Sequence, residues 1–392
     1  MGGAELAMWL VGVSEQRLPL PHLFEGFCNR LVADEIPLSH ALLGLEVLHP
    51  ELSGTLLRWQ DGELEKIHTQ RAGILTSDSY LRSPTRIVDE TNKPFRWRAG
   101  EDTMEMPRLE AYAAEGVTDY VMLPLPFLDQ SRTAVTAFTT RAQGGFSDAQ
   151  MQHLDVASRL LSPWAERAVL RKISIDLLAA YLGPEAGRRV FEGQIERGDV
   201  QTIKAAIWFC DLRGFTAMSD RFERQMLIRV MNRWFDIMGT AIEKAGGEIL
   251  KFMGDGLLAV FPLDGDHAGT CERVLDAVGE AFAGTEELNQ KLAAKGEAPM
   301  RFGLALHAGD VEFGNIGTAH RLDFTVIGPA VNMASRLEGL TKELGVPVVA
   351  SAAFAGLSGR SLRSYGRHRL RGIAEPAEVF GLEEVVAPLA AA

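Results

Sequence analysis

Two aspartates stand in short polar segments that each follow an apolar run. Asp211 lies in the segment FCDLRGFT (209–216), and Asp255 lies 44 positions later in KFMGDG (251–256). A carboxylate at the end of a buried run costs several kcal/mol unless it is paired or bound to a metal. Both runs are typical of strands, so the two carboxylates can meet at one edge of a sheet. Mg²⁺ prefers such hard oxygen ligands and keeps part of its water shell for a phosphate substrate.

The elements that must position these aspartates fill the second half of the chain. The pattern predicts a buried strand at Ile203–Phe209, a helix at Arg221–Ala245, and a hairpin of Glu248–Met253 with Leu257–Phe261. It then predicts a helix at Asp266–Leu292, a second hairpin of Arg301–His307 with Val311–Ile316 around Gly309-Asp310, a strand at Phe324–Ile327, a helix at Ala330–Leu344, and strands at Val346–Ala350, Leu362–Leu370 and Ala377–Leu382. The order β-α-β-β-α-β indicates a ferredoxin-like (split βαβ) α+β fold.

The first half is expected to be an α/β domain over residues 1–148. Its pattern predicts a helix at Pro21–Ala33, paired strands at Leu43–Leu48 and Gly54–Trp59 with an Asp61-Gly62 turn nearby, and adjacent strands at Tyr120–Phe127 and Ala134–Thr140 around a turn at 129–131. Ser147 with Gln150 forms a capping box for a long helix that runs to Leu182, where Pro163 is expected to kink or split it.

The long helix and a linker make up residues 149–199. Its apolar spacing fits either a packing helix or a dimerising, signal-passing connector. The expected second domain spans 200–385, and the tail 386–392 is expected to be disordered.

Composition excludes several classes of protein. The 392 residues carry a formal net charge of −12, which argues against nucleic acid or an anionic membrane as the main partner. The three cysteines are scattered, which favours a reducing cytoplasm and no disulfide framework. There is no stretch of eighteen apolar residues, so no membrane span is expected.

Three motifs together resemble the class III nucleotidyl cyclase catalytic domain. They are FCDLRGFT (209–216), KFMGDG (251–256) and DFTVIGPAVNMASRL (323–337), in the order and spacing of that family. The resemblance implies cyclisation of ATP or GTP to a 3′,5′-cyclic monophosphate with release of pyrophosphate. It also implies a homodimer whose active sites lie at the interface, and two Mg²⁺ (or Mn²⁺) ions per site.

The resemblance also implies roles for individual residues. Asp211, Asp255 and the main-chain carbonyl of Leu212 would bind the metal ions, with Gly214 and Phe215 beside the substrate. Asn332 would orient the ribose, and Arg336 would stabilise charge at the phosphorus, a role that suits a planar guanidinium. Arg371 stands where the family usually has a phosphate-binding lysine. One protomer would supply the aspartates, and its partner Lys251, Thr325, Asn332, Arg336 and Arg371.

Lys251 and Thr325 bear on the choice of base. A lysine only donates hydrogen bonds, which suits adenine N1, and a threonine hydroxyl can accept from adenine N6. The glutamate and cysteine of guanylate-specific relatives are absent. Thr325 replaces the usual aspartate, as in a bacterial subgroup of which some members respond to bicarbonate. Asp323 is two residues out of register and is not assigned to the base.

The segments 120–126, 134–140 and GFSD (145–148) resemble the end of a GAF sensor domain. The chain is thus expected to be a cytoplasmic adenylate cyclase with an N-terminal regulatory domain whose input, a small molecule or a protein, cannot be read from the sequence. The alternatives are a guanylate cyclase and a catalytically silent, cyclase-like dimerisation module. Bicarbonate sensitivity, activity level, strictness for ATP and the sign of regulation also stay open.

Overall fold

The computed structural model describes residues 2–16, 18–46, 52–70, 77–102, 106–128 and 134–382, and it divides the chain into two units, Met1–Leu177 and Leu178–Ala392. The elements of the first unit are α1 (Gly2–Gln16), α2 (Leu20–Ala33), β1 (His40–Glu46), β2 (Leu52–Gln60), β3 (Glu63–Gln70), α3 (Asp78–Leu81), α4 (Pro84–Thr91), β4 (Phe95–Arg98), α5 (Pro107–Ala114), β5 (Asp119–Pro124), β6 (Ala134–Thr140) and the start of α6 (Asp148–Leu182).

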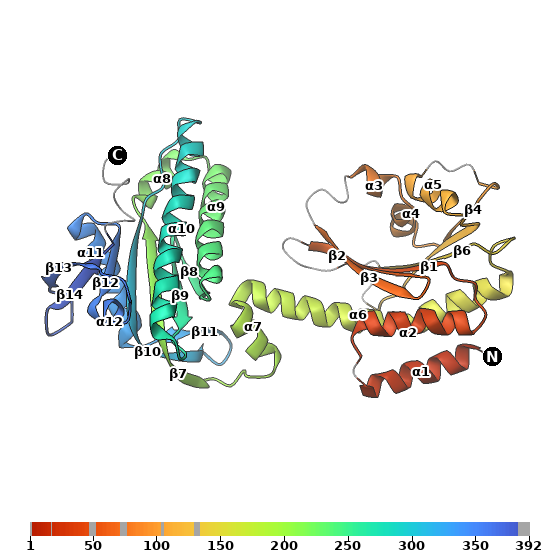
Figure 1. Cartoon of the computed structure of the whole chain (residues 1–392), viewed down its shortest axis with the longest axis horizontal. Helices are drawn as coiled ribbons and strands as arrows, with labels where there is room; N and C mark the ends of the chain where they lie inside the picture. Colours follow the sequence, from red (N-terminus) through yellow and green to blue (C-terminus); the bar gives the residue numbers. More distant parts are fainter. Residues whose placement is uncertain are drawn as a thin grey trace. The chain divides into compact units, whose positions relative to one another are not determined.

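The first unit is built on a six-stranded antiparallel sheet in the order β3-β2-β1-β6-β5-β4. Helices α1, α2 and α6 cover one face, and α3, α4 and α5 lie over the other (Figure 1). Each face has its own apolar core, and one contains Phe27 and Phe138 while the other contains Trp97 and Tyr120. This arrangement agrees with the predicted α/β class.

Strands β1 and β2 pair as predicted, and so do β5 and β6. The Asp61-Gly62 turn joins β2 to β3, a strand that the sequence pattern missed, and both turn residues have positive φ. The predicted turn at 129–131 and the expected disordered tail lie outside the described residues.

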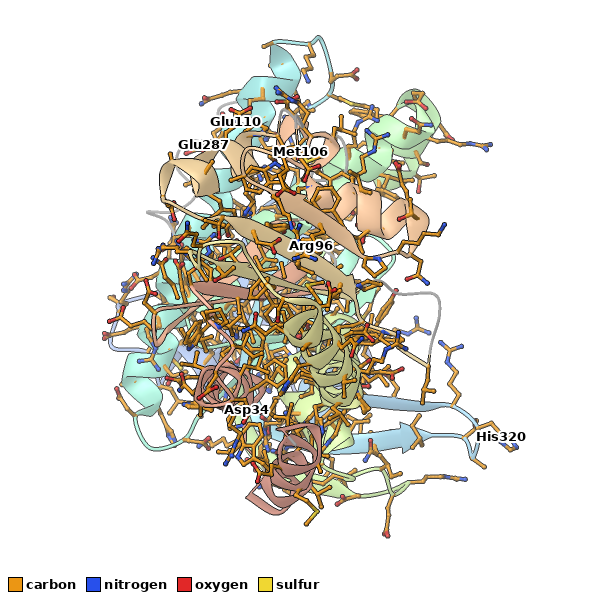
Figure 2. All side chains as sticks on the ribbon, turned by 90° about the vertical axis from the view of Figure 1, so that its right-hand side faces the viewer. Asp34, Arg96, Met106, Glu110, Glu287 and His320 are labelled. Atoms are coloured by element: carbon orange, nitrogen blue, oxygen red, sulfur yellow. The ribbon has the colours of Figure 1, made fainter. Side chains whose placement is uncertain are left out.

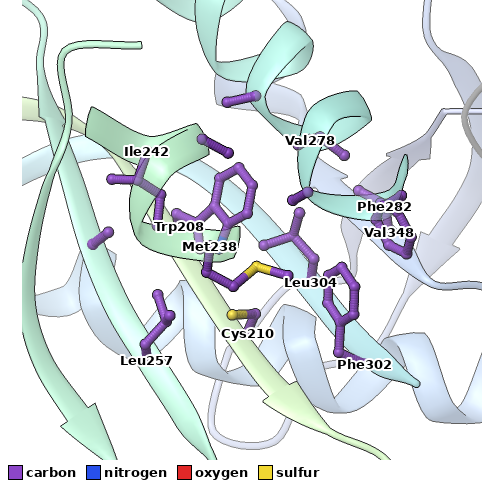
Figure 3. Packing of buried hydrophobic residues seen from close by; sticks show 14 of the residues in the cluster. Trp208, Cys210, Met238, Ile242, Leu257, Val278, Phe282, Phe302, Leu304 and Val348 are labelled. Atoms are coloured by element: carbon purple, nitrogen blue, oxygen red, sulfur yellow. The ribbon is translucent and has the colours of Figure 1, made fainter. Parts of the chain in front are cut away.

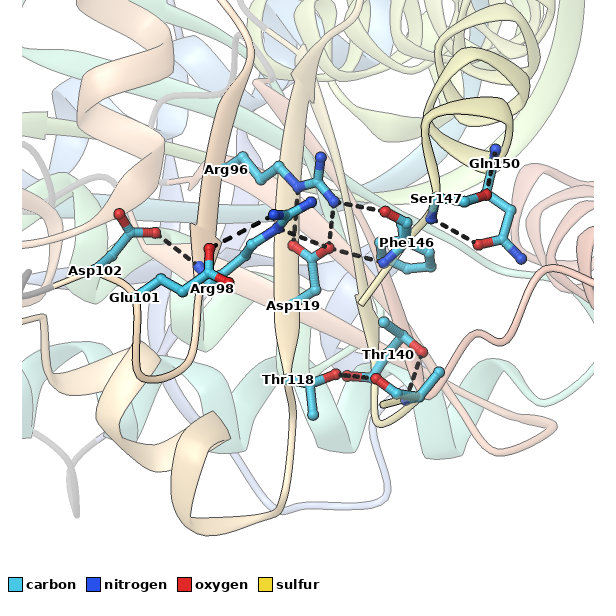
Figure 4. Close-up of polar contacts among 11 residues, drawn as sticks. Arg96, Arg98, Glu101, Asp102, Thr118, Asp119, Thr140, Phe146, Ser147 and Gln150 are labelled. Carbon is cyan, nitrogen blue, oxygen red and sulfur yellow. Dashed lines mark hydrogen bonds and ion pairs between the residues drawn. The ribbon is translucent and has the colours of Figure 1, made fainter. Parts of the chain in front are cut away.

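The beginning of α6 has a local cap and, one residue earlier, a hydrogen bond to the sheet. The predicted capping box is present, because the Ser147 amide donates to Gln150 Oε1 at 3.0 Å and the Gln150 amide donates to Ser147 Oγ at 3.3 Å. Asp119, on β5, is fully buried; it pairs with Arg96 at 2.6 Å and accepts from the Phe146 amide at 2.9 Å (Figure 4). The start of the long helix therefore cannot move independently of β5.

Pro163 does not split the helix, since α6 is one helix of 35 residues with Pro163 inside it; the alternative of a kink stays a prediction. Pro163 is exposed, and the buried positions on either side of it keep their helical spacing. Tertiary packing of those positions outweighs the helix-breaking tendency of proline. The division between the two units falls within the last turns of this helix.

The second unit contains the ferredoxin-like core. Its elements are the end of α6, α7 (Pro184–Phe191), β7 (Val200–Leu212), α8 (Phe215–Arg221), α9 (Arg224–Lys244), β8 (Glu248–Met253), β9 (Gly256–Pro262), α10 (His267–Ala293), β10 (Phe302–Gly317), β11 (Leu322–Ile327), α11 (Pro329–Leu344), β12 (Val348–Ser351), α12 (Ala352–Ala355), β13 (Arg363–His368) and β14 (Ala377–Gly381). Its eight-stranded sheet has the order β13-β14-β12-β10-β7-β9-β8, with β11 paired to β10.

The four central strands β10-β7-β9-β8 have the split βαβ order that the sequence predicted. Alternate residues of β7 enter different cores, so Trp208 and Cys210 face α9 and α10 (Figure 3) while Ile207 packs on the opposite face with α11. A strand buried on both faces reads as a continuous apolar run, which explains the pattern before Asp211. All three cysteines are free and buried.

The predicted hairpin of Arg301–His307 with Val311–Ile316 is wrong. Residues 302–317 form one strand, β10, which pairs with β7 from Phe302–Leu212 through Gly314–Val200. Gly309 does not adopt a positive φ; a Cβ there would lie 2.9 Å from that of Ala330, so this glycine makes room for helix α11. The true hairpin joins β10 to β11, and His320 lies at its protruding tip (Figure 2).

Candidate active site

Asp211 and Asp255 are brought together by the end of β7 and the turn between β8 and β9. Asp211 is in register with Gly256, and the Leu212 amide donates to the Asp255 carbonyl at 3.3 Å. Gly254 gives the turn its positive φ of 68°. A Cβ on Gly256 would lie 2.9 Å from Asp211 Oδ1, so only glycine allows the turn to approach the carboxylate this closely.

The electrostatics of this pair fit a cation site. Burial, and then the negative charge of Asp255, raise the pKa of Asp211, and Arg213 opposes them. Two neighbouring carboxylates gain from a shared cation, and their oxygens are hard donors suitable for Mg²⁺ or Mn²⁺. In the described part of the chain no three His, Cys, Asp or Glu side chains converge as a metal site. A metal here would therefore need carbonyl, water or substrate oxygens as well.

Lys251 lies on β8, four residues before Asp255, and its Nζ is 3.4 Å from Asp323 Oδ2 on β11. Asp323 and Thr325 share one face of β11, because Phe324 and Val326 point into the core on the other. The sequence did not identify this ion pair, since the two residues are 72 positions apart. Lys251 and Thr325 are therefore neighbours: Lys251 pairs with Asp323, and Asp323 is two residues from Thr325 on the same face of β11.

The hydroxyl of Thr325 is the unusual polar group of this neighbourhood. The residue is 3% exposed, and its Oγ1 has no hydrogen-bond partner among the residues that the structure describes. Leaving a buried hydroxyl unpaired costs about 1–3 kcal/mol. A ligand with a matching donor or acceptor would recover that cost.

Asn332 and Arg336 occupy one face of α11, four residues apart, on the side away from the core. Asn332 is exposed and Arg336 is half-buried. A Cβ on Gly372 would lie 3.4 Å from Arg336 Nη2, so the loop that contains Arg371 passes beside Arg336. The structure thus places Arg336 on the same helix face as Asn332, with the main chain next to Arg371 beside it.

Gly214 and Phe215 lie just after the end of β7, the strand that contains Asp211. Gly214 has a φ of 70° and begins helix α8, with its carbonyl accepting from the Met218 amide at 3.0 Å. Phe215 is half-buried and packs against the core under α9. These two residues shape the loop after Asp211, and neither presents a titratable group.

The comparisons with known proteins bear on this site directly. The model of the adenylate and guanylate cyclase catalytic domain matches residues 199–383. Residues 199–383 belong to the class III nucleotidyl cyclases. The cyclase domain is 35% identical over 198 residues to an adenylate cyclase of Anabaena cylindrica, in an alignment that covers 49% of this chain and 37% of that protein. It is 30% identical over 151 residues to adenylate cyclase 1 of Rhizobium meliloti, covering 37% of this chain and 22% of that protein.

The chain thus spans less than two fifths of the length of these relatives. Among solved structures, a bacterial light-regulated adenylyl cyclase matches with a TM-score of 0.51 at 18% identity, over 68% of this chain and 86% of that one. The adenylyl cyclase CyaB from P. aeruginosa matches at 27% identity with a TM-score of 0.42, over 46% of this chain and 94% of that one. The first of these likenesses shows the fold alone. In the described residues, no helix is both long and apolar enough to cross a membrane.

Proposed function

We propose that the cyclase domain is an adenylate cyclase, which converts ATP to 3′,5′-cyclic AMP and pyrophosphate. The observation that supports this substrate best is the buried, unpartnered hydroxyl of Thr325, two residues along β11 from Asp323, which is 3.4 Å from Lys251. Adenine offers an acceptor at N1 for the lysine and a donor at N6 for the hydroxyl. Guanine offers the reverse pattern, so Lys251 would face a donor.

The charged groups of the site suit the triphosphate. Asp211, Asp255 and the Leu212 carbonyl would hold two Mg²⁺ or Mn²⁺ ions, which when bound lower the pKa of the ribose 3′-hydroxyl and neutralise phosphate charge. Asn332 would orient the ribose by hydrogen bonding. Arg336 would donate to the oxygens that gain charge at the α-phosphorus, and Arg371 beside it would bind phosphate.

The two halves of each site are proposed to come from different protomers of a C₂ homodimer. Asp211 and Asp255 of one chain would meet Lys251, Thr325, Asn332, Arg336 and Arg371 of its partner. Each chain carries both sets, so a symmetric dimer would have two equal sites. The N-terminal unit is proposed to regulate their geometry in response to a small-molecule or protein input.

A product assay tests the proposal. The purified chain is incubated with ATP or GTP in the presence of Mg²⁺ or Mn²⁺, and the nucleotide product is identified by mass and chromatography. Cyclic AMP from ATP is expected to dominate. Preferential formation of cyclic GMP would favour a guanylate cyclase, and no cyclic product from either nucleotide would favour a silent dimerisation module.

The choice of base is tested by Lys251→Glu with Thr325→Cys. Each mismatched buried group should cost adenine about 1–3 kcal/mol, so kcat/KM for ATP should fall and the relative use of GTP should rise. Ser335→Cys, at an exposed position of α11, is a matched control for the new thiol. An unchanged ATP to GTP ratio would remove Lys251 and Thr325 from base recognition.

A further inference from the structure

An ion pair joins the chain just after Asp211 to helix α11. Arg213 follows Asp211 by two residues, and its Nη2 is 2.5 Å from Glu338 Oε1 on α11 and in contact with the hydroxyl of Thr341. Glu338 is buried, at 8% exposure. The Arg213 amide donates to the Arg301 carbonyl at 2.7 Å, so the residue is held at both its backbone and its side chain.

The packing leaves this guanidinium little freedom. Gly303 on β10 is the register partner of Asp211, and a Cβ at Gly303 would collide with Nη2 of Arg213 and come within 2.6 Å of Thr341 Oγ1. Arg213 therefore lies across a glycine, wedged between the end of β7 and α11. An ion pair with a buried carboxylate fixes geometry, because breaking it leaves an uncompensated charge.

Helix α11 has two different faces at this point. Glu338 and Thr341 are buried and face Arg213, whereas Asn332 is exposed and Arg336 half-buried on the other side. A shift of the buried face must move the other face too, because a helix of 16 residues behaves as one rigid element. Arg213 thus links the strand end that bears Asp211 to the helix that bears Asn332 and Arg336.

We propose that the Arg213–Glu338 ion pair holds the two half-sites of one chain, the end of β7 with Asp211 and helix α11 with Arg336, in a fixed position relative to each other. This inference rests on the proposed function, in which the Asp211 half and the Arg336 half of one chain serve different active sites. Within that dimer, the ion pair would connect one site to the other through the body of a single protomer. Arg213 and Glu338 act as positioning residues and do not themselves touch substrate.

Heterodimers with a single live site separate the two halves. A chain with Arg336→Ala contributes only its aspartates, and a chain with Asp255→Ala contributes only its α11 residues. Glu338→Gln is then added to one chain or to the other. In the aspartate-donating chain it should raise the half-saturating Mg²⁺ concentration about tenfold. In the α11-donating chain it should lower kcat about tenfold at saturating Mg²⁺, without changing the half-saturating concentration.

The results of these heterodimer assays can overturn the proposal in three ways. An effect in only one of the two placements, or no effect in either, would overturn the proposal, because the ion pair would then serve at most one half. Equal losses of activity in both placements, together with a lowered melting temperature, would also overturn the proposal, because the ion pair would then only stabilise the fold. If the parent heterodimer has no activity despite measured subunit exchange, the shared-site dimer itself fails, and the inference fails with it for that separate reason.

A second variant avoids removing a buried carboxylate. Gly303→Ala leaves Arg213 and Glu338 in the chain but places a methyl group where the guanidinium lies. It should reproduce both kinetic effects in the same two placements. Gly339→Ala, on α11 with open space around its Cα, is the control and should change neither quantity. Wild-type kinetics in Gly303→Ala, with Arg213 shown to be displaced, would contradict the proposal.

Discussion

The carboxylates of Asp211 and Asp255 are held together at some cost to the fold. Their repulsion and the burial of Asp211 raise the pKa of that carboxyl group. A site that concentrates like charge in this way trades stability for function, since a cation or a substrate complex relieves the repulsion only when bound. The positive charge of Arg213 lowers the pKa of Asp211 and so offsets part of this repulsion.

We therefore expect Asp255→Asn to separate stability from activity. Removing one of two repelling charges should leave the melting temperature unchanged or slightly higher. Loss of a metal ligand should lower kcat/KM for ATP at least about 100-fold. Differential scanning fluorimetry and a cyclic AMP assay measure the two quantities. Asp264→Asn, an exposed residue of a loop, controls for the change in net charge; wild-type-like turnover in Asp255→Asn would contradict the two-metal assignment.

His307 provides a pH-dependent term in the stability of the cyclase domain. Burial lowers its pKa to about 4 from an ordinary value of 6.5, and its Nδ1 lies 2.8 Å from Ser351 Oγ. Between these two pKa values the unfolded chain binds a proton at this residue and the folded chain does not. Its contribution is therefore fully present above pH 6.5 and is lost as the pH falls toward 4.

The expected result is that His307→Gln flattens the pH dependence of unfolding. Urea denaturation at pH 7 and pH 5 gives the free energies, and the difference between the two pH values should be smaller for the variant by about 1–2 kcal/mol. His320→Gln, in the exposed β10–β11 turn, serves as the control. Equal pH differences in wild type and His307→Gln would show that His307 is not held neutral by the fold.

The same residues show what a sequence can and cannot reveal. Asp211 and Asp255 stand next to strand ends and glycines, so local patterns were enough to identify them as a pair. The contacts of Lys251 with Asp323, and of Arg213 with Glu338, join residues far apart in sequence, and nothing local specifies such pairs. The unpaired state of the Thr325 hydroxyl is likewise a property of the packed structure.

At the scale of elements, apolar periodicity located most of the predicted helices and the strands of the cyclase domain. It failed at β10, where Gly309-Asp310 imitates a turn inside a strand of 16 residues. The glycine is there for a neighbouring helix, which a local pattern cannot reveal. The helices α4 and α5 were missed because each is short, and α1 was missed because its nearly continuous apolar run shows little helical periodicity.

Helix α6 presents an apolar stripe that its own unit does not cover. Val156, Leu170 and Leu177 are 47%, 42% and 37% exposed, and they are spaced by multiples of seven residues. A seven-residue apolar repeat on an exposed helix face is typical of a coiled-coil seam. The register is interrupted by Pro163 between Val156 and Leu170, so Leu170 and Leu177 are the pair on which we base the dimerising interpretation.

Charges placed in that stripe should weaken self-association. Leu170→Glu with Leu177→Glu would bring like charges together in a paired helix, and we expect the dimer dissociation constant to rise at least about tenfold. Sedimentation equilibrium measures the change, and circular dichroism verifies that each chain remains folded. Met8→Glu, at an apolar residue of α1 that is 72% exposed, is the matched control. An unaltered dissociation constant in the double variant would exclude α6 as a dimer contact.

At the scale of the whole molecule, the two units differ in how far the sequence predicts them. The cyclase domain was predicted in fold class because its motifs and its strand order are both specific. The N-terminal unit was predicted as α/β, but its likeness to a GAF domain stays a prediction. Its core under α4 and α5 contains buried aromatic residues such as Phe95 and Tyr120.

The connection between the units gives the last prediction. The Phe146 amide, just before α6, donates to the buried Asp119 of the N-terminal sheet, while Leu182 at the end of the helix packs against the core that contains Phe324. Helix α6 runs across the division between the two units, so we expect a change at its start to act on the cyclase domain through it. If the dimer forms the active sites, displacement of α6 should alter their geometry.

Two truncations test this relation between the units. Removal of residues 1–145 keeps α6, and we expect a folded, dimeric cyclase whose kcat differs from that of the full chain. Removal of residues 1–177 keeps Leu182 in its core but deletes the apolar stripe, so we expect dimerisation to weaken as well and activity to depend more steeply on protein concentration. Light scattering and a cyclic AMP assay at several protein concentrations give both quantities. Should both truncated chains match the full chain in kcat and in dimer affinity, α6 would neither pair the protomers nor transmit a signal from the N-terminal unit.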